Sequence, residues 1–185
     1  AASVLLQGKN VLYITCEMAE EKIAERIDAN LLNVNIKDVT ELPKTTFSKK
    51  VSGLASKTKG KLIIKEYPTA SAHVGHFRSL LSELHLKKSF KPDIIFVDYL
   101  NICASSRYRS AVNVNSYNYV KAIAEELRGL AVECDLPVFS ATQTTRSGFN
   151  SSDPDLTDTS ESFGLPATAD LMLALISSEE LEQLG

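Results

Sequence analysis

Three polar residues follow apolar segments that have the composition of buried β-strands. Asp98 follows the run IIFV, Glu17 follows VLYITC, and Gln143 follows VFSAT. A carboxylate at the tip of a buried strand is costly unless a cation or a hydrogen-bond donor meets it there. Magnesium with a bound nucleotide is a common partner of this kind. Phosphoryl transfer needs a metal clamp and a group that positions the nucleophile, and Asp98 and Glu17 have the chemistry for these two tasks.

The alternative interpretation is that each of these residues only caps the helix or loop that follows it. For any one of the residues taken alone, the two interpretations are equally well supported. Polar groups at several consistent strand ends favour a binding site, because parallel α/β sheets bind ligands outside the carboxyl ends of their strands.

The elements that must position these residues alternate along the chain between two hydrophobic periods. Strands that are apolar throughout are buried on both faces, and helices between them can supply right-handed crossovers. We therefore predict an α/β fold with a mainly parallel sheet flanked by helices on both faces. The predicted strands cover residues 10–17, 61–68, 93–100, 136–143 and 169–176, and the predicted helices cover residues 19–32, 44–60, 76–88 and 116–135.

The composition is that of an ordinary globular domain. The chain has 185 residues, of which 44% are hydrophobic and 23% charged, which is enough for one domain with a two-sided core. The net charge is −3, so any contact with nucleic acid must be local. The three cysteines include no CxxC pair and indicate a reducing compartment. No apolar run approaches the roughly 18 residues of a membrane span, so we expect no membrane contact.

Both ends of the chain are abrupt. It starts with AASVLLQGKN, which reads like a helix already under way, and it finishes with SSEELEQLG. We expect residues 1–185 to be a single partial domain that is truncated at both ends. The polar segment 144–162 is too long for a tight connection, and we expect a functional or mobile loop there.

Four segments resemble, in chain order, the motor domain of DnaB-type hexameric replicative helicases, which has a RecA-like fold. Their sequences are NVLYITCEMAEEKIAERI, DIIFVDYLNI, AIAEELRGLAVECDLPVFSATQTTR and LTDTSESFGLPATADLMLAL, and together they extend over nearly the whole chain. The second and third segments are the most specific, and the similarity is strongest to the helicases of T-even-like phages. The sequence ESFG resembles the family's Glu-Ser-Gly turn, with Phe163 inserted.

The resemblance implies a role for each strand-end residue. Asp98 is similar to the aspartate that holds magnesium, and Glu17 is similar to the catalytic glutamate that orients and activates the attacking water. Gln143 is similar to the residue that senses the γ-phosphate and relays its state to the DNA loops. The resemblance further implies ATP and Mg²⁺ as cofactors, a hexameric ring of identical subunits, primase and a helicase loader as partners, and a cytoplasmic location, in the host if the gene is a phage gene.

A phosphate-binding loop of the form GxxxxGK[ST] is absent from the chain, although the resemblance implies one. The segment SVLLQGKN contains Gly8 and Lys9, but Ser3 stands where the first glycine belongs and Asn10 stands where serine or threonine belongs. We interpret Gly8 and Lys9 as a turn that leads into a strand. In the family the loop lies about one helix earlier, so we expect this chain alone to be inactive.

Two segments that follow strand ends carry cations. Arg107 and Arg109 flank Tyr108 in residues 103–116, and Arg146 lies in the segment after the last predicted site residue. Arginines neutralise phosphates and aromatic rings stack on bases, although arginines in a loop are more often solvated surface. The resemblance favours contact of Arg107 and Arg109 with single-stranded DNA. For Arg146, contact with the nucleotide or with a neighbouring subunit is an alternative.

Two functions of different classes remain. The first is part of an ATP-driven DNA helicase ring, with a 5′-to-3′ polarity that only the resemblance implies. The second is a RecA-like module without a phosphate-binding loop that serves in assembly or regulation. A recombinase or clock-type ATPase of the same fold is a weaker third interpretation, because the Asp-Tyr-Leu strand end and the ESFG turn favour the helicase.

Overall fold

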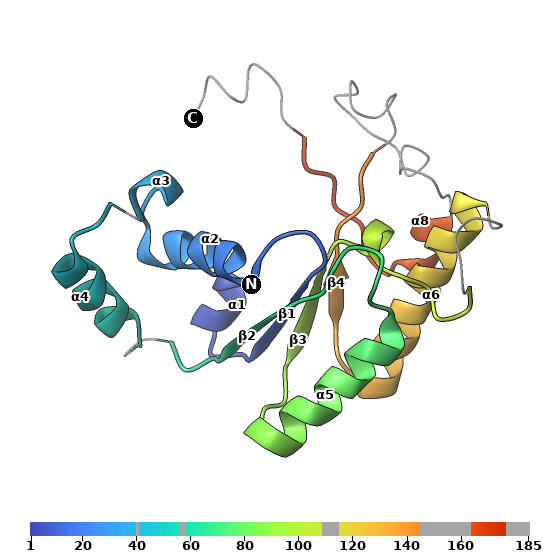
Figure 1. Ribbon diagram of the computed structural model, residues 1–185, viewed down its shortest axis with the longest axis horizontal. Coiled ribbons are helices and arrows are strands. Elements are labelled where there is room, and N and C mark those ends of the chain that lie inside the picture. Colours follow the sequence, from blue (N-terminus) through green and yellow to red (C-terminus); the bar gives the residue numbers. More distant parts are fainter. Residues whose placement is uncertain (40, 56–57, 109–114, 145–163, 177–185) are drawn as a thin grey trace.

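The computed structural model describes residues 1–39, 41–55, 58–108, 115–144 and 164–176, and the structural statements below concern these residues. At its centre lies a four-stranded parallel sheet with the strand order β2-β1-β3-β4 (Figure 1). The strands are β1 (Val11–Thr15), β2 (Leu62–Glu66), β3 (Ile94–Asp98) and β4 (Val138–Ser140). The first four predicted strands and their parallel arrangement are confirmed. The fourth strand is shorter than the predicted range of 136–143 and ends three residues before Gln143.

The strands pair so that their carboxyl ends meet at one edge of the sheet. Thr15, the last residue of β1, is in register with Asp98 at the end of β3 and with Glu66 at the end of β2. In the next pair, Val97 is in register with Ser140, the last residue of β4. The strand ends that the sequence marked with polar residues therefore lie along the edge where parallel α/β sheets bind ligands.

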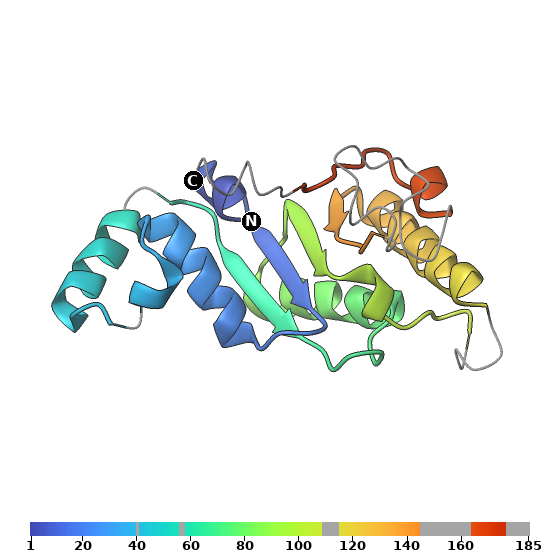
Figure 2. The same ribbon diagram turned by 90° about the horizontal axis from the view of Figure 1, so that it is seen from above.

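Two apolar layers sandwich the sheet, because successive side chains of a strand point to opposite faces. Leu12 and Ile95 belong to the larger layer, together with residues of α5 and α6. Val11 and Ile94 belong to the smaller layer, together with residues of α1 and α2. These helices are α1 (Ala2–Leu6), α2 (Glu20–Leu32), α5 (Val74–Lys88) and α6 (Ser116–Cys134) (Figure 2). The helices on both faces confirm the predicted α/β architecture.

The remaining described elements are peripheral. Helices α3 (Ile36–Val39) and α4 (Lys44–Ala55) lie beyond the β2 side of the sheet (Figure 1), and α4 contacts α2 and has no buried residue. A short 3-10 helix, η1 (Leu100–Ile102), follows β3, and α8 (Gly164–Thr168) packs against α6. No helix among the described residues combines the length and the apolar composition needed to span a bilayer.

The prediction of a strand over residues 169–176 is wrong. Residues 171–176 have no regular structure, and Leu171, Leu173 and Leu175 are 73%, 80% and 101% exposed. Their alternation has the period of a strand, but a strand forms only when its backbone groups pair with a neighbour. In the described part of the chain, β4 is the last strand on that side of the sheet, and residues 171–176 form no ladder with it.

Candidate functional site

Asp98 ends β3 in a half-buried position at the carboxyl edge of the sheet. Its Oδ2 atom accepts a 2.7 Å hydrogen bond from the hydroxyl group of Tyr13, which lies on the neighbouring strand β1. The backbone amide of Cys16 donates a 2.8 Å hydrogen bond to the carbonyl oxygen of Asp98 and so joins the ends of the two strands. Burial raises the pKa of Tyr13, and the hydrogen bond to Asp98 raises it further, so the hydroxyl group stays protonated and donates.

The chemistry of Asp98 fits a magnesium ion that keeps most of its water. Tyr13 occupies Oδ2, and Oδ1 accepts no hydrogen bond from any described residue. Within the described ranges, no group of three or more His, Cys, Asp or Glu residues lies close enough to hold a metal ion. A single carboxylate suits Mg²⁺, which is usually bound through one or two carboxylates together with water and substrate phosphates.

Glu17 lies just beyond the end of β1 and is exposed. The turn that carries it is closed by the fully buried Thr15, whose hydroxyl group accepts a 3.0 Å hydrogen bond from the amide of Met18 and donates a 2.8 Å hydrogen bond to its carbonyl oxygen. Glu17 has no hydrogen bond or ion pair with another described residue. Its carboxylate is thus held at the sheet edge and available to a ligand.

Gln143 lies three residues beyond β4 and is exposed. Its Nε2 atom lies 3.4 Å from the hydroxyl oxygen of Tyr99, the residue that follows Asp98. The preceding Thr142 donates a 2.8 Å hydrogen bond to Oδ1 of Asn101. The segments that follow β3 and β4 are therefore linked side by side, and Gln143 reaches the residue next to Asp98 directly.

The structure brings Glu17, Asp98 and Gln143 to the same edge of the sheet, but no hydrogen bond joins their side chains to one another. Gly8 and Lys9 lie at the opposite edge, before β1 begins. Gly8 has a φ of 80°, which glycine adopts readily, and the Lys9 ammonium group lies 3.9 Å from the carboxylate of Asp93, just before β3. The interpretation of Gly8 and Lys9 as a turn is confirmed.

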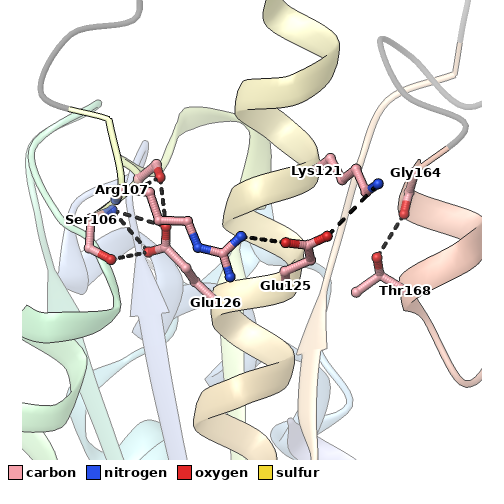
Figure 3. A network of polar contacts seen from close by, with 8 residues as sticks. Ser106, Arg107, Lys121, Glu125, Glu126, Gly164 and Thr168 are labelled. Carbon is pink, nitrogen blue, oxygen red and sulfur yellow. Dashed lines mark hydrogen bonds and ion pairs between the residues drawn. The ribbon is translucent and has the colours of Figure 1, made fainter. Parts of the chain in front are cut away.

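Arg107 is the one predicted DNA-contact residue that the structure describes, since Arg109 and Arg146 lie outside the described residues. Its guanidinium group, which is about half exposed, forms an ion pair with Glu125 of α6 (Figure 3). Lys121, one helical turn earlier, lies 3.9 Å from the same carboxylate. Arg107 is therefore a paired cation at the surface rather than a free one.

Glu126 is a functional candidate that the predictions from the sequence missed. It is 8% exposed, and its carboxylate accepts hydrogen bonds from the side chains and a backbone amide of Ser105 and Ser106, at 2.6 to 3.1 Å. Burial alone would raise the pKa of Glu126, but these hydrogen bonds lower it below its ordinary value. A signal was present, because Glu126 follows Ile123 by three residues and precedes Leu130 by four, which places it on the apolar face of α6.

All three cysteines are free, and two of them meet below the candidate site. The Sγ atoms of Cys16 and Cys103 lie 3.8 Å apart, and both residues are buried. The contact with Cys16 raises the pKa of the Cys103 thiol and burial raises it further, whereas the same contact lowers the pKa of Cys16. The pair packs the turn after β1 against the segment that follows β3.

A parallel sheet with helices on both faces and polar residues at its carboxyl edge defines a ligand-binding α/β domain, and the solved structures that share its fold agree with the expected RecA-like arrangement. The chain belongs to the family described as the DnaB-like helicase C terminal domain, whose family model matches residues 1–183. Two solved structures share the fold at 20% identity and a TM-score of 0.69. One is a DnaB-like replicative helicase described with its interactions with primase, where the match covers 92% of this chain and 41% of the other. The second is an ATPase domain, matched over 92% of this chain and 60% of its own length.

The curated relatives are helicases by name. The chain is 52% identical over 184 residues to a DnaB-like replicative helicase of Enterobacteria phage T4, a match that covers 98% of this chain. It is 30% identical over 179 residues to a probable plasmid replicative DNA helicase of Chlamydia psittaci, with 93% of this chain covered. The chain spans 38% and 37% of the lengths of these two relatives.

Proposed function

We propose that this chain is part of the motor of an ATP-dependent replicative DNA helicase, in which ATP hydrolysis drives translocation on single-stranded DNA. The proposal rests on Glu17, Asp98 and Gln143 at one edge of a parallel sheet, in a domain that is 52% identical to a DnaB-like replicative helicase of phage T4. Phosphoryl transfer depends on positioned charges more than on covalent chemistry, and this edge supplies two carboxylates and an amide for that purpose.

The three residues divide the work according to their chemistry. Asp98 would hold magnesium, and Tyr13 fixes the orientation of the Asp98 carboxylate by occupying Oδ2. A magnesium ion held there with ATP would supply positive charge that offsets the charge of the phosphates. Glu17 orients the attacking water and accepts its proton, which suits an exposed carboxylate on a rigid turn. Gln143 senses the γ-phosphate and transmits its state through Tyr99 and the segment that follows β4.

Arg107, with Arg109 and Arg146, contacts the phosphates of single-stranded DNA in this proposal. The support for Arg107 is its half-exposed guanidinium group beside Tyr108, whose ring lies 6.1 Å from that of Tyr119. Exchange of Arg107 and Arg109 for alanine weakens single-strand binding similarly across sequences. The slope of log affinity against log salt falls by about 0.7 for each phosphate that the variant no longer neutralises. An unchanged affinity and slope would contradict the DNA contact and favour a solvated or inter-subunit role for these arginines.

The partners proposed for the intact protein are those that the family resemblance implies. They are identical subunits in a hexameric ring, primase and a helicase loader, in the cytoplasm of the host if the gene is a phage gene. A relative of the same fold is described with its interactions with primase, which supports that partner.

The second candidate is a RecA-like module with a role in assembly or regulation. It is favoured by one observation, that Gly8 and Lys9 lie at the edge of the sheet opposite to Asp98 and so offer no phosphate cradle there. Calorimetry of the 185-residue chain with ATP and magnesium tests whether this chain by itself can bind the phosphates, separately from the activity of the intact protein. We expect no binding tighter than about millimolar, because backbone amides and a lysine that cradle phosphates are missing. Micromolar binding would mean that another loop holds the phosphates.

The activity of the full-length protein decides between the two candidates. The helicase proposal predicts ATP hydrolysis that single-stranded DNA stimulates, and it predicts that Glu17→Gln removes this hydrolysis. A full-length protein that neither binds nor hydrolyses ATP would favour the module.

A further inference from the structure

We propose that two adjacent carboxylates of α6 control single-strand binding by Arg107 in opposite directions. Glu126 is a positioning residue that holds the segment Ser105–Arg107 in its binding shape, and Glu125 is a counter-ion that a DNA phosphate must displace from Arg107. This inference rests on the proposed contact of Arg107 with single-stranded DNA and extends it to residues that touch no nucleic acid.

The Glu126 carboxylate is bonded to the loop through both of its oxygen atoms (Figure 3). Oε1 accepts hydrogen bonds from the Ser105 hydroxyl group at 2.6 Å and from the Ser106 amide at 3.1 Å. Oε2 accepts from the same amide at 2.9 Å and from the Ser106 hydroxyl group at 2.8 Å. A buried carboxylate needs such donors, and here they all come from one short segment, so the loop is fixed to the helix at this point.

The Ser105 hydroxyl group carries this restraint to Arg107. While it donates to Glu126, its oxygen atom accepts a 3.1 Å hydrogen bond from the backbone amide of Arg107. The amide of Ser105 donates a 3.2 Å hydrogen bond to the hydroxyl oxygen of Tyr119, also on α6. The backbone of Arg107 is therefore two hydrogen bonds away from Glu126, and the position of its guanidinium group depends on that link.

Glu125 acts on the other end of Arg107. It is the residue before Glu126 on α6, about 100° around the helix, and its carboxylate, on a side chain that is 37% exposed, pairs with the guanidinium group (Figure 3). Exposed ion pairs contribute little stability. A phosphate offers charge-assisted hydrogen bonds of the same kind and can replace the carboxylate. Glu125 thus holds Arg107 near its working position and lowers the net affinity for DNA.

Neutralising Glu125 and neutralising Glu126 are predicted to change the affinity for single-stranded DNA in opposite directions. Net charge alone does not predict this difference. Removing either negative charge beside a DNA site raises the affinity if only the overall field matters. If Glu126 positions the loop, its neutralisation lowers the affinity instead. Glutamine keeps one acceptor oxygen, but its NH2 group cannot accept the hydrogen bonds that the other carboxylate oxygen receives.

The test measures the binding of a labelled oligothymidylate by fluorescence anisotropy to the full-length, assembled protein. We expect Glu125→Gln to tighten binding by about two- to fivefold and Glu126→Gln to weaken it by about tenfold. Glu133→Gln is the matched control, since Glu133 lies on the same helix and pairs with Arg78 at 2.7 Å; we expect no change. Ser105→Ala keeps every charge, removes the relay to Arg107, and is expected to weaken binding as Glu126→Gln does.

A double-mutant cycle separates positioning from a general structural role. In the Arg107→Ala background, Glu126→Gln is expected to have no further effect on affinity. Arg107→Ala alone and Glu126→Gln alone are each expected to lower the slope of log affinity against log salt concentration by about 0.7. Equal tightening by both glutamate variants, or unchanged binding in Ser105→Ala and Glu126→Gln, overturns the inference while Arg107→Ala still weakens binding. If Arg107→Ala leaves binding unchanged, the DNA contact itself is wrong and the inference falls with it.

Discussion

The Tyr13 hydroxyl group on β1 donates a 2.7 Å hydrogen bond to Oδ2 of Asp98, at the tip of the neighbouring strand β3. The two residues are 85 positions apart in the sequence. They meet because Tyr13 is paired with Phe96 in the parallel register, and its ring stacks on that of Phe96 at 5.9 Å. The ring therefore points along the same face of the sheet as Asp98 and presents its hydroxyl group to the carboxylate.

The exchange Tyr13→Phe tests this contact. It keeps the stacked ring and removes one hydrogen bond, so we expect the fold to be preserved and magnesium-dependent ATP binding to the full-length protein to weaken by about fivefold, or about 1 kcal/mol. Calorimetry at several magnesium concentrations measures the change. Tyr117→Phe is the control, because the Tyr117 hydroxyl group bonds to no other described residue. Unchanged magnesium dependence in Tyr13→Phe would show that the contact does not orient Asp98 for metal binding.

The exchanges Glu17→Gln and Asp98→Asn separate the two proposed carboxylate roles. Glu17→Gln is expected to leave nucleotide binding nearly intact and to lower the rate of hydrolysis by roughly 10²- to 10⁴-fold, because it removes the base that positions water. Asp98→Asn is expected to weaken magnesium-dependent binding as well. Steady-state hydrolysis and calorimetry on the full-length protein provide the two measurements. Near-normal hydrolysis in Glu17→Gln would remove Glu17 from the proposed mechanism.

The exchange Gln143→Ala is expected to uncouple the nucleotide from the DNA. Gln143 contacts Tyr99, next to Asp98, and begins the segment that leads to Arg146. Binding of ATP and binding of single-stranded DNA should both remain measurable, while strand separation is abolished. The comparison is between oligonucleotide affinity and unwinding rate in the same preparation. A variant that unwinds at the normal rate would contradict a coupling role.

The stabilisation by Glu126 is expected to depend on pH. Its hydrogen bonds lower its pKa from the ordinary value of 4.5, although burial acts in the opposite direction. A carboxyl group with a depressed folded-state pKa contributes stability above its unfolded-state pKa and loses that contribution as the pH falls through the folded-state value. The thermal unfolding temperature of the wild type should therefore exceed that of Glu126→Gln above about pH 4.5, and the difference should shrink on further acidification.

The comparison with Glu126→Gln also isolates this carboxylate from its charged neighbours. Arg107 and His73 both interact electrostatically with Glu126, and both are present in the wild type and in the variant. A stability difference that stays constant between about pH 7 and pH 3 would mean that the ionised form of Glu126 does not carry the effect.

The four long helices α2, α4, α5 and α6 and the first four strands could be predicted from the sequence, whereas α3, η1 and α8 were missed. Glu17 and Asp98 lie at or just beyond the predicted strand ends, but Gln143 lies three residues beyond the end of β4. Burial on both faces makes the central strands β1 and β3 almost entirely apolar, so the carboxylate that follows each apolar run marks the tip of the strand. This reasoning does not hold for β4, whose residues are partly buried or exposed. The same local logic identified Gly8 and Lys9 as a turn, and the resemblance agreed with the family later matched over residues 1–183. The roles of the tip residues stay predictions.

The alternation of apolar residues gave a wrong strand prediction where strand formation depended on pairing with another strand. Leu171, Leu173 and Leu175 alternate like a strand, yet residues 171–176 pair with no described strand and stay exposed. Periodicity reports which side chains suit a pleated sheet, but only the arrangement of neighbouring strands decides whether backbone groups find partners.

The sequence by itself determined which residues stand at the sheet edge, because strand composition and termination are local properties. Only the tertiary structure decided what those residues touch. The parallel register places the Tyr13 hydroxyl group within hydrogen-bonding distance of Asp98. The packing of α6 beside the segment after β3 allows Arg107 to pair with Glu125, and Ser105 and Ser106 to donate hydrogen bonds to Glu126. Contacts between residues far apart in the chain depend on how whole elements pack and align, and no short-range period encodes that alignment.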